Sequence, residues 1–397
     1  MSTSLLYHNQ NLKGVRITRT AFIAGTTVFY GVISQGYQRC SNCRSRKVTH
    51  SGGRERRIKL LPTGTRPNTL SLFIPRLVCK KCGTVRQVKL PFADRGKSYS
   101  RSLARYVFLL CSHLPLNMIT KLCGLSWNTV KTIHKEGLKR KYKRVPLKKV
   151  RFIAIDEVCV GRPRKFLSIV MNLETGDILH VARGKGGNAL KQFWNRLSHS
   201  KAKIQAVCTD MASGYMSAVK EHLPDADLVL DHFHLVKYMN DKLSEIRRML
   251  YRKASEGGKR ILKGTRWYLL TSRSNLKEGC MEALDEALKY NEPLYIAYYL
   301  KEELASLWSL KTREEASRHL NNWLVKAENS GVQILENTAQ WLTQMKEYIL
   351  NWFKWPLTSA KLEAFNGKIR RLLKNTCGLR DQEYMFLRIR DLVDAKF

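Results

Sequence analysis

Two aspartates in the second half of the chain have the type and the setting of a site for phosphoryl chemistry. Asp156 follows the apolar run 150–155, and Asp210 follows the run Ile204–Thr209, so each stands at the end of an expected strand. Hard carboxylate oxygens suit Mg²⁺, and two such ions side by side can activate an attacking oxygen and stabilise a leaving one. The pair therefore favours a metal site that acts on phosphodiesters.

A third carboxylate is expected from a helix, and Glu363 is the candidate. In the segment 359–374, Asn366 and Arg370 follow Glu363 at i+3 and i+7, which places them on one helix face. Lys368 belongs to the basic surface beside that face, and Lys368 and Arg370 are candidate DNA contacts. A single aspartate after a strand is more often a cap or a turn residue, so each acid alone is weak evidence for a site.

Four further residues near these acids have less defined roles. His234 has two open interpretations, because it can orient a water molecule or a phosphate, or it can pack in the core. Glu157, Asp231 and Asp241 are candidates for auxiliary ligands, but we expect them to support the ligands indirectly or to lie on the surface.

Four cysteines of the first half have the spacing of a zinc site. The pairs Cys40/Cys43 and Cys79/Cys82 are each separated by two residues, which lets a tight turn direct both thiolates at one ion. Strands are expected at Arg56–Leu61 and Thr69–Val78, with a turn at Pro62–Pro67, which is the layout of a zinc ribbon. A single Cys-x-x-Cys pair also occurs by chance or as a redox motif, but two pairs that flank strands are far more specific for structural Zn²⁺. Basic neighbours are expected to lower the thiol pKa values. We expect the other six cysteines to be core thiols: Cys111, Cys123, Cys159, Cys208, Cys280 and Cys377.

The segment 101–140 has a helical pattern that contains a helix-turn-helix. A helix over Leu116–Cys123 would end at Gly124, and a second helix would be capped by Ser126 with Val130 and Ile133 facing inward. Outward residues of this second helix and the basic residues after it are the candidate DNA contacts: Ser126, Trp127, Asn128, Thr129, Lys131, Lys139, Arg140 and Lys141. An ordinary αα-hairpin is the alternative, and the basic flank favours DNA binding.

The charge of the chain supports a nucleic-acid partner. The 397 residues include 71 Lys and Arg against 32 Asp and Glu, a net charge of +39, and residues 1–150 alone hold 31 of these cations and only three of the acids. Nucleic acid is the partner that such an excess favours. No secretory signal is apparent at the start, and Ala21–Ile33 is too short to span a membrane, so we expect it to be a β-strand. Ten cysteines without such a signal favour a reducing compartment.

The elements that must position the acids follow from the pattern after residue 150. Strands are expected at 150–156, Lys165–Leu173, Ile178–Val181, Ile204–Thr209 and Leu228–Asp231, with a helix at Ala189–Leu197, which predicts an α/β domain with a mixed sheet. The 153 positions from Asp210 to Glu363 are far more than such a domain needs. Helical patterns at Asp241–Lys253, Lys277–Tyr290, Leu294–Leu307, Arg313–Glu328 and Ile334–Trp352 predict an all-α insertion. Six tryptophans fall in it, and we expect them to form its core rather than to stack on a distorted base: Trp267, Trp308, Trp323, Trp341, Trp352 and Trp355.

These motifs together resemble the DDE transposases of bacterial insertion sequences, specifically the insertion-sequence L-three family, over nearly the full chain. The motifs that carry the resemblance are the four cysteines, Ser126–Val130, Ile155-Asp156-Glu157, Asp210–Tyr215, Asp231-His232-Phe233-His234 and Glu363–Arg370. The chain departs from the family pattern at Ala360 and Ala364, where Asn and Gly are usual. The resemblance implies an RNase H-like domain in which Asp156, Asp210 and Glu363 bind two Mg²⁺ or Mn²⁺ ions, with His234 and Asn366 in support.

The resemblance also implies an organisation and an activity. We expect a zinc ribbon at 1–95, a helix-turn-helix domain with a basic linker at 96–149, a catalytic domain at 150–243 and 356–397, and the helical insertion at 244–355. Such an enzyme would bind the terminal inverted repeats of its element, cut and join DNA as a dimer or higher assembly, and work on the nucleoid in the bacterial cytoplasm without a membrane. The alternatives are a non-catalytic DNA-binding regulator derived from a transposase and a nuclease without strand transfer.

Overall fold

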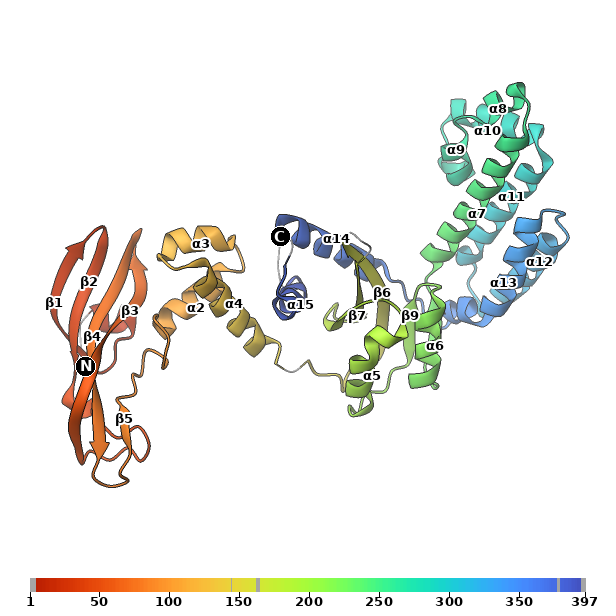
Figure 1. Ribbon diagram of the computed structural model, residues 1–397. Helices are drawn as coiled ribbons and strands as arrows, with labels where there is room; N and C mark the ends of the chain where they lie inside the picture. The colour runs from red at the N-terminus through yellow and green to blue at the C-terminus, as the bar shows by residue number, and fades with distance from the viewer. Residues whose placement is uncertain (1–4, 144, 162–164, 377–378, 394–397) are drawn as a thin grey trace. The chain divides into compact units, whose positions relative to one another are not determined.

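The computed structural model describes residues 5–143, 145–161, 165–376 and 379–393 of the chain (Figure 1). The chain divides into two compact units, Met1–Lys143 and Arg144–Phe397, and each is described by itself.

The first unit is built on a five-stranded sheet. The strands run in the order β1-β2-β4-β3, and β5 pairs with β4. A short helix, α1 (Leu5–Gln10), precedes the strands β1 (Val15–Ile23), β2 (Thr26–Ile33), β3 (Val48–Thr63), β4 (Arg66–Cys79) and β5 (Val85–Gln87). Alternate residues of β3 and β4, such as Ile58, Leu60, Leu70 and Leu72, are fully buried and form the core of this sheet.

Two expectations about these strands were wrong in detail. Residues 21–33 form a hairpin rather than one strand, because Ala24 and Gly25 adopt positive φ values of 46° and 74°, which suit a two-residue turn. The ribbon strands are longer than expected, and only residues 64–65 form their turn. Pro62 is accommodated within β3 at an irregularity of the pairing between Leu60 and Thr63, where its missing N–H costs no ladder hydrogen bond.

The helix-turn-helix is confirmed. It consists of α2 (Arg101–Leu110), α3 (Leu116–Cys123) and α4 (Trp127–Lys141). Gly124 ends α3 with a φ of 59°, and the Ser126 hydroxyl accepts a hydrogen bond of 3.3 Å from the Thr129 amide. The turn is fixed to the sheet, since the Lys59 ammonium donates to the Gly124 carbonyl and a side chain on Gly124 would meet Pro67.

The second unit contains a mixed five-stranded sheet with an RNase H-like arrangement. Its strands are β6 (Phe152–Gly161), β7 (Lys165–Asn172), β8 (Ile178–Arg183), β9 (Ala206–Thr209) and β10 (Asp227–Leu230), in the order β10-β9-β6-β7-β8. The pairs β6/β7 and β7/β8 are antiparallel, whereas β9 and β10 run parallel to β6. The expected mixed sheet is therefore confirmed.

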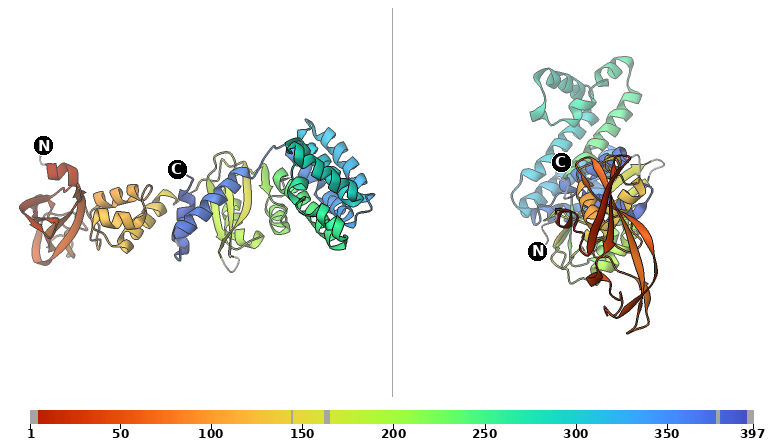
Figure 2. Two further views of the ribbon diagram at one scale, coloured as in Figure 1. Left: turned by 90° about the horizontal axis from the view of Figure 1, so that it is seen from above. Right: turned by 90° about the vertical axis from the view of Figure 1, so that its left-hand side faces the viewer.

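Helices cover both faces of this sheet (Figure 2). The short helices α5 (Lys191–Ser198) and α6 (Ser213–His222) lie on one face, and α14 (Ala360–Asn375) and α15 (Gln382–Asp391) lie on the other. Along β6, Ile153 and Ile155 face the first layer, whereas Ala154 and Val158 face α14. Because both faces are covered, β6 is apolar on both sides except where it carries acids.

The expected helical insertion is confirmed. It contains α7 (His232–Lys253), α8 (Glu256–Leu262), α9 (Arg266–Leu270), α10 (Glu278–Tyr290), α11 (Glu292–Ser306), α12 (Arg313–Glu328) and α13 (Gln333–Leu350). Helix α7 begins nine residues before the expected start, directly after β10, because Asp231 caps it. One hydrophobic core runs from the α5/α6 face of the sheet through this bundle.

The tryptophans of the insertion do not all share one environment. Trp323 is fully buried and donates to the Leu300 carbonyl at 2.7 Å, as expected for a bundle core. Trp308 and Trp352 pack edge to face with 5.2 Å between ring centroids, whereas Trp267 is 68% exposed. In the described ranges, no helix is long and apolar enough to cross a membrane.

Candidate active site and zinc site

Asp156 does not stand at the end of its strand, as the sequence suggested, but in the middle of β6. It pairs with Ile169 of β7, and β6 continues to Gly161. The expected edge is formed by β9 instead, because β9 stops at Thr209 opposite Ile155. Asp156 and Asp210 are therefore each the first residue beyond the last β6/β9 pair, which places the two aspartates next to each other at that edge.

The Asp156 side chain lies where the charged form of its carboxylate is disfavoured. It is 9% exposed, and its carboxylate accepts hydrogen bonds from the Asn366 amide at 2.8 Å and from the Glu157 backbone N–H at 2.7 Å. Burial raises the pKa of Asp156 to about 6; the charges of Asp210 and Glu363 add to this rise, while the Glu157 amide and His234 oppose it. The three acids form a set of hard oxygen donors, and a divalent cation would favour the charged form of Asp156.

Glu363 and His234 reach the same place from two helices. Glu363 lies in the first turn of α14, and its Oε1 is 3.4 Å from Nε2 of His234 in the first turn of α7. Of the two interpretations of His234, its position beside Glu363 favours a role at the acids. Asn366 is buried against Asp156, whereas Arg370 is exposed, so the two lie on neighbouring positions of one helix face but differ in burial. The sheet covers the side of this helix face that holds Asn366, whereas Arg370 lies on the side that the sheet leaves exposed.

Asp231 is the residue whose role sequence reasoning missed. It is 1% exposed, so it is not a surface group. Its carboxylate accepts hydrogen bonds from the Phe233 amide at 3.0 Å, from the Ser359 amide at 2.6 Å and from the Ser359 hydroxyl at 2.5 Å. This single side chain joins the start of α7 to the start of α14. The only sequence signal was local: an aspartate after a strand and a serine before a helix are both common caps.

Glu157 and Asp241 differ in their relation to the acids. Burial first, and then the charge of Asp210, raise the pKa of Glu157, while a hydrogen bond with Tyr215 opposes the rise. The Tyr215 hydroxyl also bonds to Ser168 at 2.6 Å, and burial raises its pKa to about 12. Asp241 lies on an exposed position of α7. Glu157 therefore borders the acid cluster, and Asp241 fits the expected surface group.

The possible metal-binding atoms of the four cysteines lie closer together than those of the three acids. Within the ranges that the structure describes, only the four cysteines bring three or more metal-binding atoms within 4.8 Å of one another. Cysteines around one ion must all lie that close, whereas carboxylates that share two ions about 3.5–4 Å apart can lie farther from one another.

The zinc site has the dimensions of a tetrahedral shell. Cys40 Sγ lies 3.6 Å from Cys82 Sγ, and Cys43 Sγ lies 3.5 Å from Cys79 Sγ. A tetrahedron with Zn–S bonds of about 2.3 Å has edges of about 3.8 Å, so the four sulfurs need almost no movement to bind the ion. Antiparallel pairing of Val48 with Cys79 holds the two knuckles together.

The thiol pKa values are set by hydrogen bonds rather than by the basic side chains that the sequence suggested. Backbone N–H groups of Cys43 and Asn42 lower the pKa of Cys40, and the Thr84 hydroxyl and amide lower that of Cys82 to about 5. At Cys43 the Ser45 amide also lowers the pKa, but desolvation and the neighbouring sulfurs outweigh it and raise the pKa to about 11. The Cys82 sulfur is thus readily a thiolate, whereas a bound cation would favour the loss of the proton from Cys43.

The other cysteines follow the expectation only in part. Cys111, Cys123 and Cys208 are buried, Cys280 is half-buried, and Cys159 is exposed, so a core role is wrong for Cys159. Its position near the end of β6 faces away from the packed layers. Cys377 lies outside the described residues.

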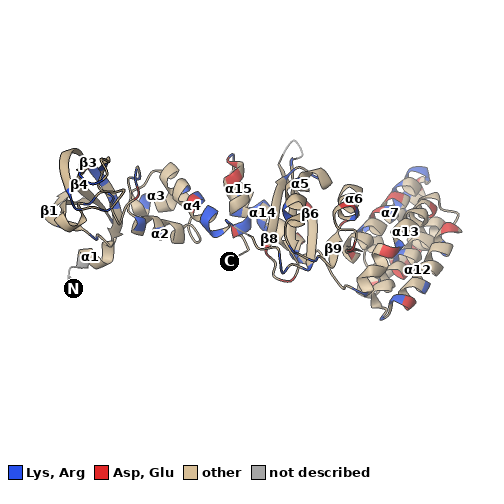
Figure 3. Ribbon diagram, turned by 90° about the horizontal axis from the view of Figure 1, so that it is seen from below, with Lys and Arg blue, Asp and Glu red and all other residues tan. Residues whose placement is uncertain are grey.

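The predicted DNA contacts lie on two helices. On α4, Trp127 is 47% exposed with the Lys131 ammonium 5.7 Å from its ring centroid, Ser126 and Asn128 are exposed, and Thr129 is half-buried. The last turn of α4 carries the exposed cations Lys139, Arg140 and Lys141 (Figure 3). On α14, Arg370 is exposed and Lys368 is half-buried.

Comparison with protein families matches three parts of the chain. A model of the zinc-finger of the transposases of IS204, IS1001, IS1096 and IS1165 matches residues 37–82. A model of the helix-turn-helix domain of transposase family ISL3 matches residues 88–136, and an ISL3 model described as a transposase matches residues 153–389.

Two relatives are similar over most of their length. The transposase for insertion sequence element IS1001 of Bordetella parapertussis is 30% identical over 88% of this chain and 87% of the relative. The transposase for IS1557 of Mycobacterium tuberculosis is 26% identical over 87% and 83%. Among solved structures, the Drosophila P element transposase strand transfer complex matches at 12% identity over 76% of this chain and 93% of that one, with a TM-score of 0.39. The four-cysteine site, the helix-turn-helix, the catalytic-domain match and the full-length relatives agree, and this chain belongs to the ISL3 family of insertion-sequence transposases.

Proposed function

We propose that this transposase binds the terminal inverted repeats of its insertion sequence and catalyses metal-dependent cleavage and strand transfer with Asp156, Asp210 and Glu363. The observation that carries the proposal is the buried Asp156, whose pKa rises to about 6 beside the other two acids. Asp210 and Glu363, which lie far from Asp156 in the sequence, both contribute to this rise, and a bound cation would offset it.

The acids would hold two Mg²⁺ ions, or Mn²⁺ in their place. Such ions activate an attacking oxygen and stabilise the leaving oxygen at the phosphorus. Asn366 holds one carboxylate oxygen of Asp156 in place through its 2.8 Å hydrogen bond. His234 faces Glu363 and is placed to orient a water molecule or a phosphate oxygen. Asp231 fixes the helix that presents Glu363.

The rest of the chain is proposed to deliver DNA to these acids. The zinc ribbon (1–95) and the helix-turn-helix domain with its linker (96–149) would bind the repeat ends, with Trp127, Asn128 and Lys131 at base edges and the cations that end α4 on phosphates. The catalytic domain (150–243 and 356–397) would enclose the helical insertion (244–355). Joining two element ends requires two active sites, so we propose a dimer or a higher assembly on nucleoid DNA.

The test separates binding from cleavage. Asp156→Asn and Glu363→Gln should each lower Mg²⁺-dependent cleavage of a labelled inverted repeat by at least ~100-fold, because even a residue that only supports a metal ligand is worth 10–100-fold. Binding of the same DNA should be unchanged. Asp241→Asn, which changes an exposed acid of α7, is the matched control and should cleave normally. Cleavage retained by either test variant would contradict the assignment of the triad.

A further inference from the structure

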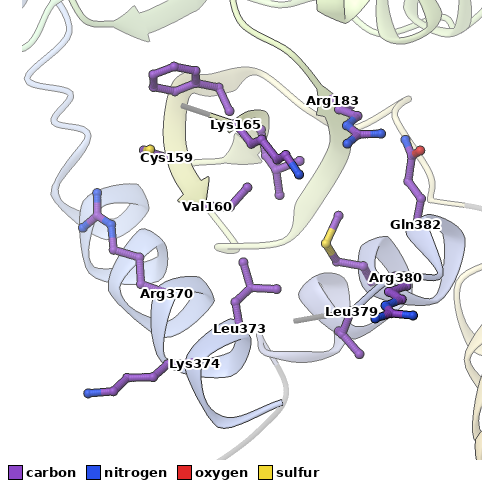
Figure 4. Close-up of a pocket in the computed structure, with 13 residues that line it drawn as sticks. Cys159, Val160, Lys165, Arg183, Arg370, Leu373, Lys374, Leu379, Arg380 and Gln382 are labelled. Atoms are coloured by element: carbon purple, nitrogen blue, oxygen red, sulfur yellow. The ribbon is translucent and has the colours of Figure 1, made fainter. Parts of the chain in front are cut away.

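A pocket of about 550 Å³ lies in the second unit at the far end of α14 from the acids (Figure 4). Its walls come from the ends of β6 and β8, the start of β7, the second half of α14 and the start of α15. Leu167 of β7 pairs with Arg183 of β8, so both side chains point to the sheet face that α14 and α15 cover. The pocket therefore opens on the same face of the sheet as Asp156.

The rim of this pocket carries cations without acids. Among the residues that the structure describes, five exposed basic ones line it and no Asp or Glu does: Lys165, Arg183, Arg370, Lys374 and Arg380. Among the described residues, none of the five forms an ion pair with an acid. So many cations around one cavity repel one another, and an anion with several charges would offset that repulsion.

The interior of the pocket is apolar. Val160, Leu373, Leu379 and Met385 line it and are only half-buried, so they present apolar surface to whatever fills the cavity. Figure 4 shows Val160 and Leu373 in the space between the strand ends and α14, with the side chains of Arg370 and Lys374 directed outward from it. A ligand that matches both features has a flat, weakly polar group joined to negative charge. A nucleotide does, because its base can stack on apolar side chains while its phosphates bind the rim.

One stripe of α14 connects the acids with the pocket. Glu363, Gly367, Arg370 and Lys374 follow each other at i, i+4, i+7 and i+11, which is one face of a helix. A Cβ on Gly367 would meet no atom within 4 Å, so packing does not explain why this poor helix former sits in mid-helix. Seven residues of helix span about 10 Å, which corresponds to about three nucleotides of a stacked strand.

We propose that this pocket binds an unpaired nucleotide of the DNA strand that occupies the active site, about three nucleotides from the bond that is cut. The proposal rests on the proposed function, since it takes the strand at Glu363 to be DNA. Gly367 leaves room for the backbone between the two points, the rim binds the flanking phosphates, and the base lies against Val160 and Leu373. A base that is stacked and paired within an intact duplex cannot enter the pocket, so the ligand is a base that has left its stack.

A tethering experiment in the full-length protein tests the occupant. The variant Cys159→Ser/Val160→Cys places a thiol on the pocket wall and removes the exposed native thiol beside it. Repeat-end DNA carries a disulfide tether on one base, moved position by position away from the cleavage site. We expect an adduct that peaks at a position about three nucleotides away and that increases when this base is unpaired. Cys159→Ser alone is the control, and Cys159→Ser/Leu379→Cys offers the opposite wall if the first variant does not fold.

A charge experiment tests the rim independently. Arg183→Ala/Lys374→Ala/Arg380→Ala should reduce the slope of log K against log salt for single-stranded DNA by about 2, because each lost phosphate contact removes about 0.7. Arg248→Ala/Arg252→Ala/Lys253→Ala removes the same charge from exposed positions at the end of α7 and should leave the slope unchanged. Equal slopes for the two triple variants would overturn the proposal.

Parallel cleavage assays distinguish failure of this inference from failure of the proposed function. If the parent protein cleaves but no position gives an adduct, or duplex positions give it equally well, the pocket assignment is wrong and the triad assignment stands. If the parent does not cleave, the proposed function fails whatever the adduct shows.

Discussion

At the scale of single residues, the properties of Asp156 depend on the groups that surround its carboxylate. The Asn366 amide is the one side chain among the described residues that donates a hydrogen bond to it, and the Asn366 carbonyl oxygen has no protein partner although it is buried. An oxygen buried without a partner at the edge of an acid cluster suits a water molecule of a hydrated cation. Asn366 is therefore a positioning residue as well as part of the core.

Asn366→Ala should lower cleavage 10–100-fold and raise the Mg²⁺ concentration needed for half-maximal rate, because the Asp156 carboxylate loses the donor that orients it. A Mg²⁺ titration of the cleavage rate measures both effects. Asn375→Ala, an exposed change at the other end of the same helix, should alter neither. An unchanged Mg²⁺ dependence in Asn366→Ala would remove Asn366 from the site.

Sequence reasoning could propose the three acids as a site because each follows or begins an element with a clear pattern. It could not find the bond between Asp231 and Ser359, since two capping residues 128 positions apart leave no local signal of their pairing. It also did not show that Asn366 is buried and Arg370 exposed, because helical spacing alone does not tell which side of a face the sheet covers. Residue types were predictable, and their partners were not.

At the scale of elements, stability and the proposed DNA path place opposite demands on residue 367 of α14. Gly367→Ala should raise the free energy of unfolding by about 0.5–1 kcal/mol, because alanine is the better helix former and its Cβ meets no atom. Gly367→Leu should fold equally well but lower strand transfer at least tenfold, since its side chain would fill the path between Glu363 and Arg370. Urea unfolding and a joining assay on the two variants measure the two effects. Normal joining by Gly367→Leu would show that no strand passes there.

His180 on strand β8 makes the free energy of unfolding depend on pH. Burial first, and then the charges of Arg196 and Arg390, lower the pKa of His180 to about 4, against about 6.5 in the unfolded chain. Between these values the unfolded chain binds a proton that the folded chain does not. The stability present above pH 6.5 is therefore lost as the pH falls towards 4.

The free energy of unfolding should thus fall by about 2 kcal/mol from pH 7 to pH 5 through His180 alone. The raised pKa of Asp156 acts in the opposite direction over pH 4–6, so the informative comparison is between His180→Phe and its parent. The variant keeps a ring against Phe193 and removes the titration. Equal pH dependence of the two proteins in urea unfolding would show that His180 does not contribute.

The elements were predicted best where the pattern is long and periodic, as in the helices of the insertion and in α4. The hairpin of β1 and β2 was missed because Ala24 and Gly25 are weak turn signals in an otherwise continuous apolar run. Asp156 was expected at a strand end, because the sequence shows where an apolar run stops but not that a mixed sheet lets β6 continue past its parallel neighbour.

At the scale of the whole molecule, the zinc site and the acid site belong to different units and should fail separately. Removal of zinc by a chelator, or Cys79→Ser, should abolish binding to repeat ends, because the energy of metal binding is folding energy for this small sheet. Metal analysis and DNA-binding titrations measure the loss. Cys280→Ser, in the insertion, should keep zinc and bind normally. A zinc-free Cys79→Ser protein that keeps its fold and its DNA affinity would refute the role of the ion.

The division of charge was visible in the sequence and is visible on the molecule, where acids are sparse in the first unit and mixed with cations over the helical bundle (Figure 3). The sequence did not reveal that the bundle and the catalytic sheet share one hydrophobic core. Periodicity shows which face of a helix is apolar, but the partner of that face is decided only in the folded chain.

The hydrogen bonds between Asp231 and Ser359 have a consequence for the length of the helical insertion. The chain leaves the catalytic sheet at Asp231, forms the helical bundle, and returns to the Asp231 carboxylate at Ser359, 128 positions later. Two hydrogen bonds from Ser359, one from its amide and one from its hydroxyl, join the two ends of this segment at the Asp231 side chain. Closing a loop costs free energy that grows only with the logarithm of its length, so the bundle can be lengthened or shortened at small cost. The placement of the acids therefore depends on the contact between Asp231 and Ser359 and hardly on the length of the segment between them.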